Sequence, residues 1–301
     1  MIRRARYILA AAGTTAILAG GMTLAGAGAA SAQTLPSCAS GVNCASNFAG
    51  AAGYNGADDN HTHYRYVQTE TTAAPQLVNL NGTGDNLGST GVSLCDENTG
   101  EVAQLSLGYN TGTPHGSLPL GFHVGYRVGR FTLGAAEPCV QNAGMHIHGA
   151  PFNKGNLLQF TGITQGDKIF LSISYSTSRS GRHASIHFVA IDITAGVVRS
   201  ATVSVSPKSF TEFGIGAFTA NQQLTAPANN PLAAFALNQV ACYGCANPVP
   251  ITSVSPVNPF NIGGLYESQL INGSSQVTMS PLDSLAVSTD EFGIQNGSTS
   301  I

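Results

Sequence analysis

The sequence contains no tryptophan and few charged residues, and the low charge argues against one class of binding partner. Charged side chains make up 9% of the 301 residues, and the formal net charge at pH 7 is -3. Binding to nucleic-acid phosphates requires clustered lysine and arginine, whereas most of the basic residues here stand alone. Nucleic acid is therefore not expected as a partner.

Helical periodicity is also scarce. Outside the N-terminal segment, apolar residues do not recur at helical spacing except in NPLAAFALNQ, residues 230–239, where we expect a short helical turn. A helical bundle is therefore not expected.

Alternation of apolar and polar residues recurs along the chain instead. Period two is typical of strands with one buried face. The alternating stretches, each bounded by Gly, Asn, Asp or Pro, are residues 63–71, 101–110, 122–134, 168–178, 183–194 and 197–206. The pattern predicts an all-β fold, and an antiparallel β-sandwich or jelly roll fits it best. We expect one domain over 33–301, with the Pro- and Asn-rich segment 246–264 as a surface crossing inside it.

Residues 1–32 have the composition of an export signal. Arg3, Arg4 and Arg6 precede a run of Ala, Leu and Gly, and an Ala-Ser-Ala sequence ends at Ala32. The alternative, a transmembrane anchor, calls for a longer apolar run with fewer glycines. We expect cleavage before Gln33, a secreted, extracellular protein, and no membrane span after cleavage.

The chain has six cysteines, and all of them follow the expected cleavage site. An even number of cysteines in an oxidising compartment predicts disulfides. Pairing Cys38 with Cys44 and Cys242 with Cys245 would close two short loops and leave Cys95 for Cys139, although other pairings are open. The Cys-x-x-Cys spacing at 242–245 also occurs in redox and zinc sites, but no second such pair completes a zinc site.

Several short stretches, taken in order along the chain, resemble elements of one protein family. SNFAGAAG at 46–53 is similar to an opening Asn-Trp-Ala-Gly element, and VQTETTAAP at 67–75 to a first strand that ends in proline. VAQLSLGY at 102–109 resembles a strand that carries a catalytic glutamine, and the order continues in residues 165–175, 190–198, 210–221 and 276–294. The chain thus resembles the glutamic peptidases called eqolisins and their actinobacterial relatives, which implies an exported β-sandwich of the concanavalin A-like type.

In eqolisins a glutamine and a glutamate share one water, with the glutamate as general base and acid and the glutamine as the group that polarises the carbonyl. The resemblance implies that Gln104 is this glutamine. The glutamate belongs to a strand before a Phe-Gly element, yet no acidic residue lies between Thr194 and Phe210. The tryptophans that line the family's cleft are also absent. The resemblance therefore implies a scaffold in which the catalytic pair is broken.

Three glutamates elsewhere in the sequence are considered as replacements for the missing catalytic carboxylate. Glu212 is the nearest by sequence, although it matches an ordinary position of the Glu-Phe-Gly element. Glu70 could reach the site from an adjacent strand. Glu101 precedes Gln104 by three residues and should point to the opposite face of its strand.

Aromatic residues on strands offer a second kind of site. Relatives of the wider fold bind glycans on a concave sheet face, using aromatic platforms and polar donors. Tyrosine is also simply common in strands. The candidate ligand-binding residues are Tyr64, Arg65, Tyr66, Tyr109, Tyr126 and Arg127.

Histidines occur in pairs spaced two apart, so that each pair shares a strand face. His61 with His63 and His146 with His148 could together supply four nitrogens to a metal. No His-Glu-x-x-His motif or comparable acid spacing accompanies them. We expect solvent-facing or hydrogen-bonded histidines, with these four as the metal candidates; His183 and His187 are read in the same way.

Two functions follow from these patterns. The first is a secreted β-sandwich protein with a binding or cell-surface role, whose ligand is an extracellular polymer such as a glycan or cell-wall component, or a protein. The alternative is a glutamic-type acid endopeptidase that uses Gln104 with a relocated carboxylate. We expect no cofactor and a monomer. A carboxylate facing Gln104 at hydrogen-bond or one-water distance would favour the peptidase.

Overall fold

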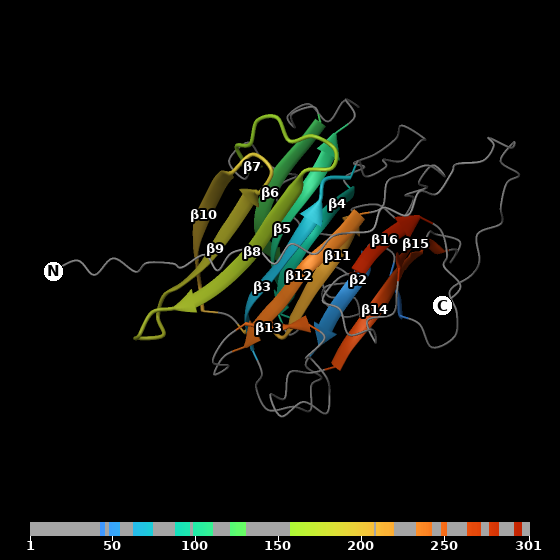
Figure 1. Ribbon diagram of the computed structural model, residues 1–301. Coiled ribbons are helices and arrows are strands. Elements are labelled where there is room, and N and C mark those ends of the chain that lie inside the picture. The colour runs from blue at the N-terminus through green and yellow to red at the C-terminus, as the bar shows by residue number, and fades with distance from the viewer. Residues whose placement is uncertain are drawn as a thin grey trace, which may run out of the picture. The chain divides into compact units, whose positions relative to one another are not determined.

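The described part of the chain is built almost entirely of β-strands, which confirms the all-β class (Figure 1). The computed structural model describes residues 43–45, 48–54, 63–74, 88–96, 99–110, 121–130, 157–207, 209–219, 233–242, 248–251, 264–271, 277–282 and 292–296. The expected export signal and most of segment 246–264 lie outside these residues. No helix in the described ranges is long and apolar enough to cross a membrane.

Most of the alternating stretches form strands close to their expected bounds. The first strands along the chain are β1 (Asn43–Ala45), β2 (Phe48–Tyr54), β3 (Tyr64–Thr72), β4 (Gly88–Asp96), β5 (Glu101–Asn110), β6 (Gly121–Arg130), β7 (Leu157–Leu158) and β8 (Lys168–Thr177). They are followed by β9 (Ala184–Asp192), β10 (Val197–Val205), β11 (Glu212–Thr219), β12 (Ala233–Cys242), β13 (Val249–Pro250), β14 (Gly264–Ile271), β15 (Val277–Leu282) and β16 (Phe292–Asn296).

The strands form a hydrogen-bonded path that folds over into two layers. Its order is β10-β9-β8-β3-β12-β16-β15-β14-β2-β11-β4-β5-β6-β7, with β13 added on β12 and β1 on β14. Neighbours are antiparallel, except that β1 runs parallel to β14. In Figure 1, β8, β3 and β12 lie in front of β5, β4 and β11, and the strand order adds β9 and β10 to the first group and β6 to the second. We call these the β9 layer and the β5 layer; together they make the β-sandwich that the alternation predicted.

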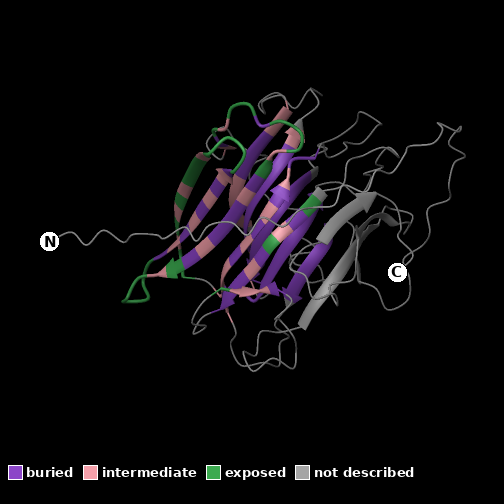
Figure 2. Ribbon diagram, viewed as in Figure 1, coloured by how far each residue is buried: buried purple, intermediate pink, exposed green. Residues whose placement is uncertain are grey.

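The core lies between the two layers because one side of each strand is apolar. In β9, buried residues alternate with half-buried ones from end to end, which Figure 2 shows as purple and pink bands. Two aromatic pairs cross from one layer to the other. Tyr126 of β6 stacks on Phe188 of β9 with ring centroids 4.9 Å apart, and Tyr64 of β3 meets Phe213 of β11 edge-on at 5.0 Å. Both pairs bury large apolar surfaces, which is the main stabilising contribution in such a fold.

Strand β12 replaces the helical turn expected at 230–239, so that expectation was wrong. Its register against β3 shifts between Ala236 and Gln239, where β12 has one residue more than its partner. In this β-bulge Leu237 has a φ of 54° and is half exposed, while Asn238 is buried and its Oδ1 accepts a hydrogen bond from Thr69 at 2.6 Å. The extra residue breaks the alternation, which is why the sequence did not indicate a strand.

The connection between β10 and β11 is short. β10 ends at Val205 and β11 begins at Glu212, and the described residues between them, 206, 207 and 209–211, are not in a strand. The resemblance places the glutamate of eqolisins between Thr194 and Phe210, a span that includes β10 itself, and no acidic residue lies in it.

Two cysteines are buried at strand ends. Cys95 of β4 and Cys242 of β12 are each disulfide-bonded, and no described cysteine is free. Cys38, Cys139 and Cys245 lie outside the described residues, so the pairing of the six cysteines stays a prediction.

Candidate functional site

Gln104 lies in the middle of β5 on the side that faces away from the core. Ala103, Leu105 and Leu107 belong to the apolar core, and alternation places Gln104 and Ser106 on the other side of the strand. Both polar residues are nevertheless buried, with 0% and 1% exposure. This side of β4, β5, β6 and β11, called the Gln104 face below, is therefore a buried polar surface.

Arg127 fixes the orientation of the Gln104 amide. The two residues are directly opposite each other on β5 and β6, and Arg127 Nε donates a hydrogen bond of 2.6 Å to Gln104 Oε1. Burial lowers the pKa of Arg127 to about 10, so the guanidinium still carries its charge at neutral pH. Because the oxygen of the amide is held by Arg127, its nitrogen is the donor presented to any other group.

On β4 and β5, three side chains of the Gln104 face have buried polar atoms that form no hydrogen bond with the described residues. These atoms are Gln104 Nε2, Ser93 Oγ and Ser106 Oγ. Ser93 of β4 lies directly opposite Gln104, and Ser106 is two residues along β5, so the three share one side of adjacent strands. An unsatisfied buried polar group costs about 1–3 kcal/mol, which makes a set of three unusual. We refer to Ser93, Gln104, Ser106 and Arg127 as the Gln104 cluster.

Glycines surround Ser106. Gly91 of β4 and Gly125 of β6 are its direct partners in the register. An ideal Cβ on Gly91 would lie 2.2 Å from the backbone oxygen of Leu105, so only glycine fits there. The same holds for Gly216 of β11, whose Cβ would lie 2.2 Å from Ala49 O. Ser106 thus stands between two positions without side chains, where the strands approach each other closely.

His123 borders the cluster on β6. It is directly opposite Gly108, where an added Cβ would lie 2.6 Å from His123 Nε2, so the ring occupies the space left by the glycine. Its Nδ1 lies 3.5 Å from the carbonyl oxygen of Gly121. Burial lowers the pKa of His123, partly offset by this contact, so the ring is neutral at neutral pH.

Glu212 lies on β11, on the same side as Gln104 but not next to it. It is directly opposite Cys95, which is directly opposite Val102 on β5. Glu212 is therefore two strands away from Gln104 and two residues further along. This spacing puts their Cα atoms about 12 Å apart. Its charge acts on Tyr64 instead, since burial and the Glu212 carboxylate together raise the pKa of Tyr64. No carboxylate of the described residues hydrogen-bonds to Gln104.

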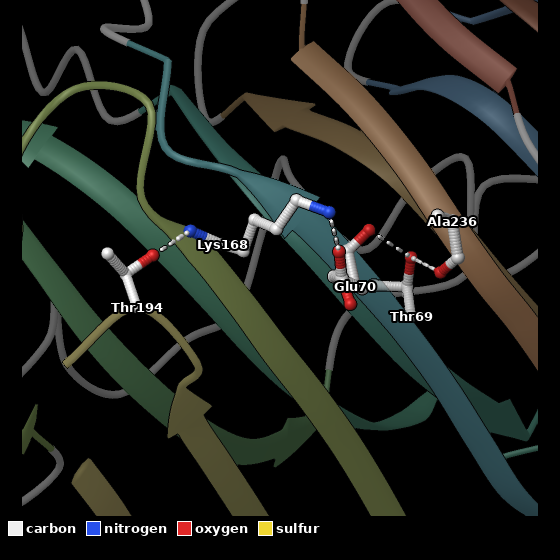
Figure 3. A network of polar contacts seen from close by, with 5 residues as sticks. All are labelled: Thr69, Glu70, Lys168, Thr194 and Ala236. Atoms are coloured by element: carbon white, nitrogen blue, oxygen red, sulfur yellow. Dashed lines mark hydrogen bonds and ion pairs between the residues drawn. The ribbon is translucent and has the colours of Figure 1, made fainter. Parts of the chain in front are cut away.

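Glu70 lies in the other layer, so the expectation that it could reach Gln104 from an adjacent strand was wrong. β3 pairs with β8 and β12, and Lys168 Nζ of β8 lies 3.0 Å from Glu70 Oε1 (Figure 3). The backbone N–H of Lys168 donates to Thr194 Oγ1 at 3.0 Å. This ion pair lies on the side of the β9 layer that faces away from the core.

The expected ligand-binding residues are dispersed over the sandwich. Tyr64 and Tyr126 are packed in the core through their ring pairs. Tyr66 donates a hydrogen bond to Gln68 Oε1 in the β9 layer, and Arg65 lies half-buried between it and Tyr64 on β3. Tyr109, near the end of β5, packs on Phe122 at 4.7 Å. Of the set, only Arg127 contacts Gln104, so the described residues form no shared aromatic platform.

The paired histidines fall largely outside the described residues. His61, His146 and His148 lie outside the described residues, while His63 precedes β3 and is half-buried. His183 and His187 are on β9 or just before it, and His187 Nδ1 lies 2.9 Å from Thr202 Oγ1. Within the part of the chain that is described, no three His, Cys, Asp or Glu side chains gather as metal ligands would.

Ser93, Ser106 and His123 are not among the residues that the sequence singled out. Ser106 could have been found, because it follows Gln104 by two residues in an alternating strand and must share its side. Ser93 and His123 lie near Gln104 only because β4 and β6 pair with β5. No local sequence pattern indicates which strands pair with each other.

The sequence matches no protein-family model, and no curated protein is significantly similar to it. The resemblance to eqolisins therefore rests on the residue stretches given above.

Proposed function

We propose that this protein is a secreted β-sandwich that binds an extracellular polymer through the Gln104 cluster and does not hydrolyse it. The observation that carries the proposal is the Gln104 amide, whose oxygen is held by Arg127 while its buried nitrogen has no partner. An amide N–H₂ with two neighbouring hydroxyls suits a ligand group that accepts hydrogen bonds. A carbonyl oxygen is such a group.

The ligand class that fits best is a glycan bearing N-acetyl groups, as cell-wall glycans do. Its acetamido carbonyl would accept from Gln104 Nε2, and the Ser93 and Ser106 hydroxyls can donate or accept as the ligand requires. The dispersed tyrosines argue that recognition rests on these hydrogen bonds more than on stacking. Binding would require the cover of the Gln104 face to open, because Gln104 and Ser106 are 0% and 1% exposed, and each bond would then form without competition from water.

Lack of hydrolysis follows from the missing carboxylate. General acid–base catalysis contributes about 10² to 10⁴ in rate, and it requires a group within reach of the attacking water. No acidic residue lies between Thr194 and Phe210, where the resemblance places the glutamate of eqolisins, and the Glu212 carboxylate acts on Tyr64 instead.

Calorimetric titration with an N-acetylchito-oligosaccharide and a cello-oligosaccharide of equal length tests the binding. We expect binding of the acetylated sugar alone. Gln104→Glu, which replaces the donor by an acceptor in the same shape, should weaken it at least tenfold, or about 1.4 kcal/mol. The matched control is Gln68→Glu in the β9 layer, which should bind as the wild type does. Equal binding of both sugars, or an unaffected Gln104→Glu variant, would refute the proposed ligand.

A glutamic-type peptidase is the second candidate, favoured by the fact that Glu212 is buried on the same side of the sheet as Gln104. Casein digestion at acid pH distinguishes the two functions. We expect no digestion by the wild type. Robust digestion that both Gln104→Ala and Glu212→Gln abolish would establish the peptidase instead.

A further inference from the structure

Among the described strands, β10 forms a long edge of the β9 layer. All nine of its residues, Val197–Val205, pair with β9 on one side in an unbroken register. On its other side, the described residues provide no strand partner, and β10 ends the strand order (Figure 1). Several of its residues are exposed, including Val198 at 54%, and Figure 2 shows the strand mainly in green and pink. Within the described part of the chain, the backbone groups on this side of β10 therefore have no strand to pair with.

The sequence of β10 lacks the residues that usually protect an edge strand. Natural edges are kept from pairing by proline, lysine, bulges or short length. The strand VVRSATVSV has none of these and carries one charge, Arg199. The Arg199 side chain is bound within the same molecule, because its Nε donates to Gln159 O at 2.7 Å and its guanidinium lies over the Phe160 ring. A backbone edge of this kind favours strand addition.

The sequence of β10 is compatible with antiparallel pairing to itself. A two-fold axis at Ala201 would set Ser200 opposite Thr202 and Arg199 opposite Val203 of the second copy. No like charges oppose each other, and the two Arg199 residues would lie about 13 Å apart along the strands, beyond the Debye length at physiological salt. Ser–Thr pairs opposite each other are favourable on a sheet. The same surface then serves both copies, as a two-fold dimer requires.

We propose that two copies of this chain associate through antiparallel pairing of their β10 strands, which continues the β9 layer across a homodimer. The occupant of the edge is thus a second copy, which departs from the monomer expected from the sequence. A single strand pair is a small interface, so the dimer should be weak and its population should rise with concentration.

Sedimentation equilibrium over a micromolar to millimolar range tests the dimer, with two charge variants. In the double variant Ser200→Lys with Thr202→Lys, like charges face each other across the axis, and we expect a monomer throughout. In Ser200→Glu with Thr202→Lys, opposite charges face each other, and dimerisation should be kept or strengthened. The matched control, Ser174→Lys with Ser176→Lys, adds the same charge two strands inside the edge and should dimerise as the wild type does.

Circular dichroism and thermal melting of each variant confirm that it is folded. A wild type that stays monomeric at every concentration would overturn the proposal and leave the edge to an extended segment of another protein. A dimer that persists in the Ser200→Lys, Thr202→Lys variant, or that is lost equally in the control, would show that β10 is not the interface.

Discussion

The two layers of the sandwich both carry polar side chains on the side away from the core, but the layers treat these side chains differently. In the β9 layer, Ser176 and Ser185 share a hydrogen bond of 3.0 Å, and Lys168 pairs with Glu70. In the β5 layer, Gln104 and Ser106 are buried and each has an atom without a partner. The same alternation of residue types thus gives a surface in one layer and an enclosed polar cluster in the other. A ligand group that hydrogen-bonds to the enclosed cluster would therefore gain more binding free energy than one bound on the β9 layer.

The largest expected difference between the layers is in the stability lost when a side chain is enlarged, because the strands of the β5 layer are tightly packed. Gly216→Val should destabilise the fold by about 3 kcal/mol or more, because its Cβ would collide with the backbone oxygen of Ala49. Ser176→Val, an addition on the exposed side of the β9 layer, should change stability by no more than about 0.5 kcal/mol. Urea unfolding measures both, and similar values would show that the β5 layer can adjust.

Removing one cation from each layer compares a buried contact with an exposed one. Arg127→Met leaves Gln104 Oε1 buried without its donor, which should cost about 3 kcal/mol. Lys168→Met removes an ion pair whose lysine side chain is 62% exposed, and the loss should stay below about 1 kcal/mol. Equal losses in chemical denaturation would mean that water reaches the Gln104 cluster.

Shortening a serine should have opposite effects in the two layers. Ser106→Ala removes an unsatisfied buried hydroxyl, so without ligand it should leave stability unchanged or raise it by up to about 1 kcal/mol. Ser185→Ala loses a hydrogen bond and should lower stability by a few tenths of a kcal/mol. The free energies of unfolding test this. A clear loss of stability in Ser106→Ala would show that an ordered water already satisfies the hydroxyl.

The smallest expected effect is on how the stability of the fold depends on pH. Burial lowers the pKa of His123 in the folded state, so as pH falls below about 6.5 the unfolded chain takes up this proton first. The contribution of His123 to stability is therefore complete above that pH and is lost progressively below it. His123→Phe, which keeps a flat ring over Gly108, should lose less stability than the wild type between about pH 8 and pH 5. Parallel pH profiles of the two proteins would contradict this.

The strands could be predicted where their signal is local, and the site could be predicted only in part. β3, β5, β8, β9 and β10 follow from alternation, which a single strand displays by itself. Arg127 is 23 residues from Gln104, and their contact depends on which strands become neighbours, a property of the whole chain. Arg127 was indeed expected to bind a ligand, but as part of an aromatic groove that the described residues do not form. β12 was missed because Leu237 interrupts its alternation.

The bulge at Leu237 has a consequence for insertions and deletions. Phe235 and Val240 are five residues apart, an odd number, yet both are buried on the core side because β12 holds one residue more than β3 between them. Deleting one residue here, or adding one, would turn every later side chain of β12 to the other side, with Val240 outward and Gln239 inward. A change of one residue in the length of this stretch should therefore cost more stability than a single change of residue type, because it exchanges the inward and outward sides of the rest of the strand.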